Sequence, residues 1–168
     1  ILSFSFVIGF GFSIAGATLV GQHLGALDVN QARRSGWGAM RLSIISMSLF
    51  GLLISLFAES LAYFMINDES VVRLTVLFIW LLGSMQPFMA IEFSLGGALR
   101  GAGYTKTPLM ITLTCLVLIR VSLAGLFFYF SLPVEYIFAS LLADYIVKGF
   151  LYTYSFRSGK WVHAIKST

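Results

Sequence analysis

Charge is scarce in this sequence of 168 residues, because 11% of the residues are acidic or basic and 58% are apolar. Soluble proteins carry about 25% charged residues, and a water-soluble domain of this size could not bury so much apolar surface. Residues 1–22, 42–58 and 74–91 contain no Asp, Glu, Lys or Arg. A helix needs about 17 to 25 apolar residues to cross a bilayer, so the composition predicts a membrane protein.

Other absences exclude further classes. Cys115 is the lone cysteine, which rules out an internal disulfide framework. No Ser-His-acid constellation and no HExxH pattern is present, so we do not expect an enzyme or a metal centre. A basic segment before the first apolar stretch, which a secretory signal needs, is also lacking.

Five apolar segments are long enough to cross a bilayer as helices. They cover about residues 2–22, 42–66, 72–99, 108–132 and 136–156. Membrane β-strands would instead show segments of about 10 residues that alternate in polarity, and these five do not alternate. We therefore predict an all-α integral membrane protein whose five transmembrane helices form one antiparallel bundle.

The basic residues between the segments predict which side of the membrane each connection faces. One side holds eight of them: Arg33, Arg34, Arg41, Arg100, Lys106, Arg157, Lys160 and Lys166. The other side holds Arg73, next to a short turn at residues 67–70. Cytoplasmic loops carry an excess of Lys and Arg, so we predict that the richer side and the C-terminus are cytoplasmic. This arrangement explains the formal net charge of +4 without a nucleic-acid partner.

Small residues recur at every fourth position of the first segment. They are Ser5, Gly9, Ser13, Ala17, Gly21 and Gly25. Membrane helices approach closely along such ridges, so the spacing predicts tight packing against a neighbouring helix rather than a ligand site.

The third segment combines a proline with an acidic residue. Pro87 has no amide hydrogen, so it frees the carbonyl of Gly83 one turn earlier and predicts a kink. Glu92 follows about 12 Å from Arg100 along the helix axis and therefore lies inside the hydrocarbon. A carboxylate at that depth is protonated, bound to a cation or paired with a base such as Arg100. Glu92 is thus a candidate for proton or cation coupling, with structural pairing as the alternative.

Three further charges lie within the last two segments. Arg120 is in the middle of the fourth, and Asp144 and Lys148 are one helical turn apart in the middle of the fifth. One Asp and one Lys cost roughly 6 kcal/mol on insertion, more than the ~4 kcal/mol that the apolar residues of the fifth segment supply. Pairing of Asp144 with Lys148, or with Arg120 at the same depth, would offset this deficit. We predict a structural charge network, and Asp144 is the second coupling candidate if the network lines a cavity or relays protons.

Two connections carry a recognisable pattern. The first segment runs into Gly21-Gln22-His-Leu-Gly25-Ala, and the third runs into Ala-Leu-Arg100-Gly101-Ala-Gly103. This ordered pair resembles the C-terminal half of the multidrug and toxic compound extrusion (MATE) transporters, which carries GQxLGA and LRGAG turns after corresponding helices. Two positions depart from that pattern. Tyr104 replaces an acidic residue or Asn, and Ser122 replaces a proline, which favours a straighter fourth helix.

The resemblance implies a transporter of twelve helices in two lobes, in which the five segments are helices eight to twelve. The chain opens directly in apolar sequence at Ile1, so we expect it to be a piece of a longer polypeptide or a processed product. The N-terminal lobe and helix seven are then absent. The resemblance also implies antiport of cationic or amphipathic organic compounds against sodium ions or protons, by alternating access, in the plasma (inner) membrane. The expected partners are a small organic substrate, membrane lipid and the missing N-terminal half, without a cofactor beyond the coupling ion.

Two other functions stay open at this stage. A flippase for lipid-linked saccharides, from the same wider superfamily, would need a more cationic cavity than Arg120 and Lys148 provide. A structural membrane subunit without transport activity would need all of its buried charges to be paired.

Overall fold

The computed structural model describes residues 2–65, 69–130 and 134–162, and every regular element in these ranges is helical. The elements are α1 (Leu2–Gly25), α2 (Val29–Leu56), α3 (Ala58–Met65), α4 (Glu69–Gly101), α5 (Lys106–Cys115), the π-helical segment η1 (Leu116–Val121), α6 (Ser122–Tyr129) and α7 (Val134–Arg157). The predicted all-α fold is confirmed. Lys166 and residues 67 and 68 of the predicted turn lie outside the described ranges.

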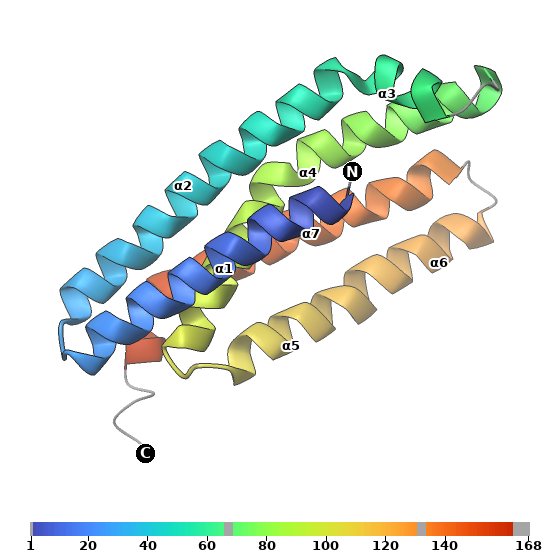
Figure 1. Ribbon diagram of the computed structural model, residues 1–168. Coiled ribbons are helices and arrows are strands. Elements are labelled where there is room, and N and C mark those ends of the chain that lie inside the picture. The colour runs from blue at the N-terminus through green and yellow to red at the C-terminus, as the bar shows by residue number, and fades with distance from the viewer. Residues whose placement is uncertain (1, 66–68, 131–133, 163–168) are drawn as a thin grey trace.

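Four helical stretches are long and apolar enough to cross a membrane. They are Ser3–Gly25, Val29–Leu56, Val71–Gly101 and Lys106–Phe127, the last of which runs from α5 through η1 into α6. Helix α7 has 24 residues, as many as α1, and runs beside these stretches (Figure 1). The chain is therefore a membrane protein.

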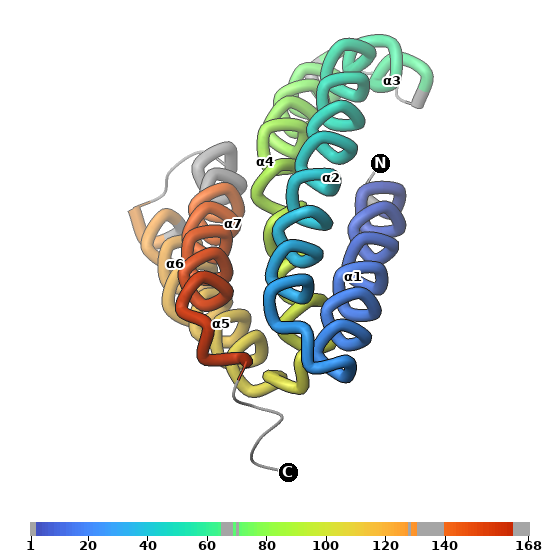
Figure 2. The backbone as a smooth tube through the Cα atoms, turned by 90° about the vertical axis from the view of Figure 1, so that its left-hand side faces the viewer, coloured from blue at the N-terminus to red at the C-terminus, as the bar shows by residue number. Residues whose placement is uncertain are grey.

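Helix α4 occupies the centre of the bundle. It contacts α1, α2 and α7, and α7 in turn contacts α5, η1 and α6. Figure 2 shows the result as two groups, with α1, α2, α3 and α4 on one side and α5, α6 and α7 on the other. Contacts between α4 and α7, with a smaller number between α4 and α5, join the two groups.

The second helix begins much earlier than hydropathy predicts, at Val29 rather than at residue 42, and it ends at Leu56. Asp28 caps its first turn, because its carboxylate accepts a hydrogen bond from the amide of Gln31 at 3.0 Å. The three arginines predicted in a connection, Arg33, Arg34 and Arg41, therefore lie inside α2. A hydropathy boundary marks only the apolar part of a helix, whereas a cap marks where the backbone hydrogen bonds begin.

The ridge of small residues on α1 packs against α4, as its spacing predicts. A Cβ atom on Gly97 would overlap the backbone of Ser13, and one on Gly101 would overlap the backbone of Ala17. The two helix backbones therefore touch without side chains between them. Gly25 at the end of the ridge has open space around its Cα, so the ridge contact stops before it.

The end of the bundle at which α1, α4 and α7 end and α2 and α5 begin is here named the basic end (Figure 1). An aromatic cluster closes it. The rings of Phe156 and Trp161 stack with centroids 4.8 Å apart, and Trp37 of α2 meets Phe156 edge-on at 5.4 Å. Trp161 also donates from Nε1 to the carbonyl of Phe156 at 2.8 Å. These contacts fasten the residues that follow α7 onto the neighbouring helices.

Candidate functional site: a charge cluster between two helices

Three charged side chains meet at the interface of α4 and α7. The ammonium nitrogen of Lys148 lies 2.9 Å from Asp144 Oδ2 and 3.7 Å from Glu92 Oε1. The side chains of Asp144, Lys148 and Glu92 are 0%, 6% and 19% exposed, respectively. We call these three residues the charge cluster.

The sequence of α7 explains why two members of the cluster share a face. Asp144 and Lys148 are four residues apart, and Ser140 and Tyr152 extend the same spacing by one turn in each direction. All four side chains are buried. An acidic residue placed four positions before a lysine is the favourable order for a helical ion pair. The ring of Tyr145 adds a cation–π contact, with its centroid 5.2 Å from Lys148 Nζ.

The cluster contains two carboxylates and one ammonium group. Lys148 contacts both carboxylates, yet its single charge balances only one of them. Asp144 Oδ1 has no hydrogen-bond partner in the part of the chain that the structure describes. A buried carboxylate without full compensation is costly, so the site favours the arrival of one further positive charge. A proton or a monovalent cation meets that requirement.

Arg100 and Arg120, the two other bases predicted as possible partners of these carboxylates, form no ion pair with the cluster. Arg100 donates from Nη2 to the hydroxyl of Ser13 on α1 at 3.0 Å. Arg120 is half-buried in η1 and forms no ion pair with any side chain that the structure describes. Of the two pairings that the sequence left open for Asp144, the structure contains the one with Lys148. For Glu92 it contains a contact with Lys148 rather than with Arg100.

The predicted kink residues lie away from the cluster. Pro87 is inside α4, which continues through it as one helix. Gly83 packs against α2, where an added Cβ atom would overlap the hydroxyl of Ser55. A groove of about 310 Å³ between the two helices contains Pro87 and the hydroxyls of Ser48 and Ser55. Glu92 instead contacts α7, so the structure does not bring the carbonyl of Gly83 to this carboxylate.

The fourth predicted segment is not a uniform α-helix. The π-helical segment η1 interrupts it and contains Arg120. Ser122 donates a hydrogen bond to the carbonyl of Val117 at 3.1 Å, and this partner satisfies a backbone acceptor in the widened turn. The replacement of proline by Ser122 therefore does not produce a regular helix here. Short π-helical segments inside α-helices frequently occur at functional sites.

The two turns that carry the family pattern differ in why they need glycine. Gly103 has φ of +76°, a left-handed conformation that side chains disfavour. Gly21 instead allows close approach, because a Cβ atom on it would lie 3.0 Å from the carbonyl oxygen of Gly101. Gln22 and Gly25 are exposed, and Gly25 has no close neighbour.

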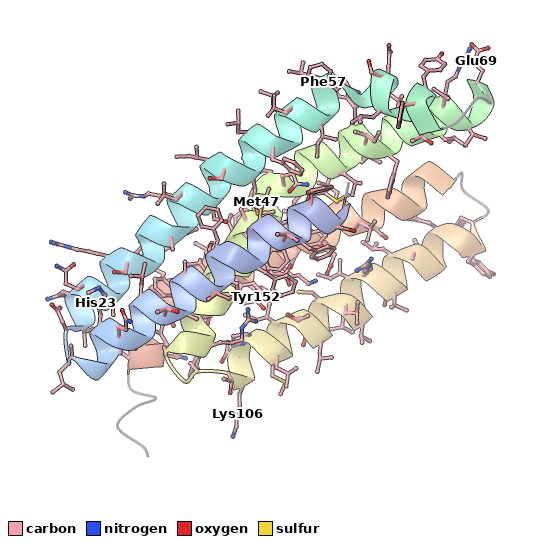
Figure 3. The ribbon with its side chains drawn as sticks, in the orientation of Figure 1. His23, Met47, Phe57, Glu69, Lys106 and Tyr152 are labelled. Carbon is pink, nitrogen blue, oxygen red and sulfur yellow. The ribbon has the colours of Figure 1, made fainter. Side chains whose placement is uncertain are left out.

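Two further polar side chains lie in the interior of the bundle, and the first of them was not singled out from the sequence. Gln86 is 1% exposed and donates from Nε2 to the hydroxyl of Ser5 at 2.7 Å, while its Oε1 has no partner among the described residues. Gln86 could have been found from the sequence, because its amide side chain lies within an otherwise apolar segment. Tyr152 lies inside the bundle and donates to the carbonyl of Pro108 at 3.2 Å, with the hydroxyl of Thr112 3.0 Å away (Figure 3). Tyr152 thereby links α7 to α5.

Comparison with known families and proteins gives a consistent result. The family model described as MatE matches residues 1–126. A Thermotoga maritima protein named probable multidrug resistance protein NorM is 33% identical over 163 residues, which are 95% of this chain and 34% of that protein. The human multidrug and toxin extrusion protein 2 is 38% identical over 100 residues, 59% of this chain and 16% of that protein. No solved structure matches. The chain therefore spans about a third or less of the length of these relatives.

Proposed function

Because the chain belongs to the MatE family, we propose that it forms part of a membrane exporter for organic compounds, cationic or amphipathic in character. Family membership carries this proposal, since the relatives are named for multidrug resistance and for multidrug and toxin extrusion. The chain spans 34% of the Thermotoga maritima relative, so we further propose that a second helical lobe completes the substrate cavity.

We propose that sodium ions or protons drive the export, and that the charge cluster is where the driving ion acts. Two observations support this role. The cluster has one carboxylate more than its lysine balances, and it lies on the contact between α4 and α7. A cation that binds at Glu92 or Asp144 would therefore change the electrostatic attraction between two helices. Antiport needs such a link between ion binding and helix packing.

In the complete transporter, the substitution Glu92→Gln tests the coupling role, because it keeps the volume of the side chain and removes its charge. The expected result is a loss of ion-driven efflux, while substrate binding and folded yield persist because Lys148 retains its partner Asp144. Efflux of a fluorescent cationic dye from proteoliposomes, driven by an imposed sodium or proton gradient, measures the first quantity. Equilibrium binding of the same dye measures the second.

A matched control is Glu59→Gln, since Glu59 is exposed on the short helix α3. This variant should keep its dependence on the ion gradient. If Glu92→Gln also keeps its full dependence, Glu92 has no part in coupling and Asp144 becomes the residue to test. If it loses dye binding as well, the carboxylate acts on the substrate instead.

The need for a second lobe has its own test. Reconstituted alone, the 168-residue chain should give no ion-dependent efflux, because a cavity between lobes needs both of them. Efflux by the isolated chain would mean that copies of it assemble into a working transporter, which would remove the second lobe from the proposal.

A further inference from the structure

A pocket of about 230 Å³ lies between α5 and α7 at the basic end. We call it the α5–α7 pocket. Its wall changes character along the helix axes, since Ile111 and Leu151 line one part and Tyr104, Ser158 and Lys160 line another. From this gradient we propose that the α5–α7 pocket binds one anionic phospholipid, with the phosphate at Lys160 and the start of an acyl chain beside Ile111 and Leu151.

The apolar and polar parts of the pocket wall lie at the depths of the acyl chains and of the headgroup of a phospholipid, respectively. Ile111 lies five residues after Lys106, which starts α5, and is therefore about 7.5 Å into the helical region at 1.5 Å per residue. Leu151 lies at a similar depth before the end of α7 at Arg157, so both face acyl chains rather than water. Tyr154 is 74% exposed on the same wall, and tyrosine rings collect at the level of the headgroups.

The turn after α7 places a positive charge at the mouth of the pocket. Ser158 donates from its hydroxyl to the carbonyl of Ser155 at 2.8 Å, and Gly159 adopts φ of +71°, which turns the chain so that Lys160 lines the pocket. A Cβ atom on Gly159 would lie 3.0 Å from Nη2 of Arg33, so a second cation borders this turn.

The sequence around the pocket strengthens the preference for a negative ligand. Residues 93–134 and 145–168 contain no Asp or Glu. Every formal charge in these two ranges is therefore positive, and basic pockets between membrane helices bind anionic headgroups. The apolar part of the wall distinguishes a lipid from a soluble phosphate, because a free phosphate ion has nothing to place beside Ile111 and Leu151.

The test uses the complete protein in nanodiscs of equal parts phosphatidylglycerol and phosphatidylcholine, released into the gas phase for native mass spectrometry. Wild type should retain one phosphatidylglycerol molecule in preference to phosphatidylcholine. Lys160→Gln should lower that preference about fivefold, which corresponds to ~1 kcal/mol for one basic side chain at the membrane surface. Lys160 is exposed, so the substitution leaves the packed core untouched.

The matched control is Lys106→Gln, which removes the same charge from a side chain that projects away from the bundle (Figure 3). It should retain the wild-type preference. Equal losses in both variants would show a diffuse surface charge, and equal retention of both lipids by wild type would show no selective site. Displacement of the lipid by millimolar inorganic phosphate would identify a phosphate site instead. Each of these three results would overturn the proposal, and none depends on transport activity.

Discussion

Removal of the ammonium group from the charge cluster is the most informative perturbation that the structure offers. In Lys148→Met the side chain keeps its length and loses its charge, which leaves Glu92 and Asp144 without the base that both of them contact. At an effective dielectric constant of about 20, unit charges at the observed 2.9 Å and 3.7 Å attract by about 6 and 4–5 kcal/mol. Desolvation of the three groups cancels much of this gross attraction.

The net loss of stability comes from the buried carboxylates that are left without a base, and not from the sum of the two Coulomb energies. Removing one partner of a buried ion pair costs about 3–5 kcal/mol, so we expect Lys148→Met to lower the free energy of unfolding by that amount. Titration with SDS in mixed micelles, followed by circular dichroism, measures it. Adding Asp144→Asn to Lys148→Met should restore part of the loss, because the second substitution removes a stranded charge.

Two outcomes would refute this account of the cluster. An unfolding free energy in Lys148→Met within about 0.5 kcal/mol of wild type would mean that the lysine balances nothing. A double variant as unstable as the two single losses added together would mean that Lys148 and Asp144 do not interact. Lys106→Met is the matched control and should be neutral, since Lys106 is exposed at the start of α5.

Three further predictions concern orientation and backbone packing. A cysteine at Glu69 should react with an impermeant thiol reagent in intact cells, and one at Lys160 only after the membrane is opened; the reverse pattern would invert the topology. Gly97→Leu should lower folded yield in size-exclusion chromatography because its Cβ would overlap the backbone of α1, whereas Gly11→Leu, with open space around it, should not. Gly103→Ala should cost about 1–2 kcal/mol in the same SDS titration, because alanine resists its positive φ; no loss would show that the turn relaxes.

Features that depend on spacing along one helix could be predicted from the sequence. The pair of Asp144 and Lys148 is an example, because residues four apart share a face of any α-helix. The contact of the small-residue ridge with a neighbouring helix follows for the same reason. The start of α2 could also have been predicted, since Asp28 and Gln31 form a capping pattern. The hydropathy pattern instead placed the start of the helix after the last charged residue of this region, Arg41.

Features that depend on which helices meet could not be predicted in this way. The partner of Glu92 is on α7, whereas its own helix offered Arg100, and nothing in the order of residues states that α4 packs against α7. The π-helical segment around Arg120 could not be predicted from the sequence either. An extra residue in a helical turn changes neither composition nor hydropathy, so the sequence pattern of an α-helix hides it.

The geometry of the cluster explains how one ion could act on helix packing. Lys148 contacts Asp144 within α7 at 2.9 Å and Glu92 on the neighbouring helix at 3.7 Å. Neutralisation of Glu92 by a proton or cation would leave the first contact in place and remove the second. Helix α7 would keep a paired lysine, while the attraction that ties it to α4 would weaken. Because α4 and α7 belong to different groups of helices, ion binding at the cluster in the proposed exporter would change the attraction between those groups.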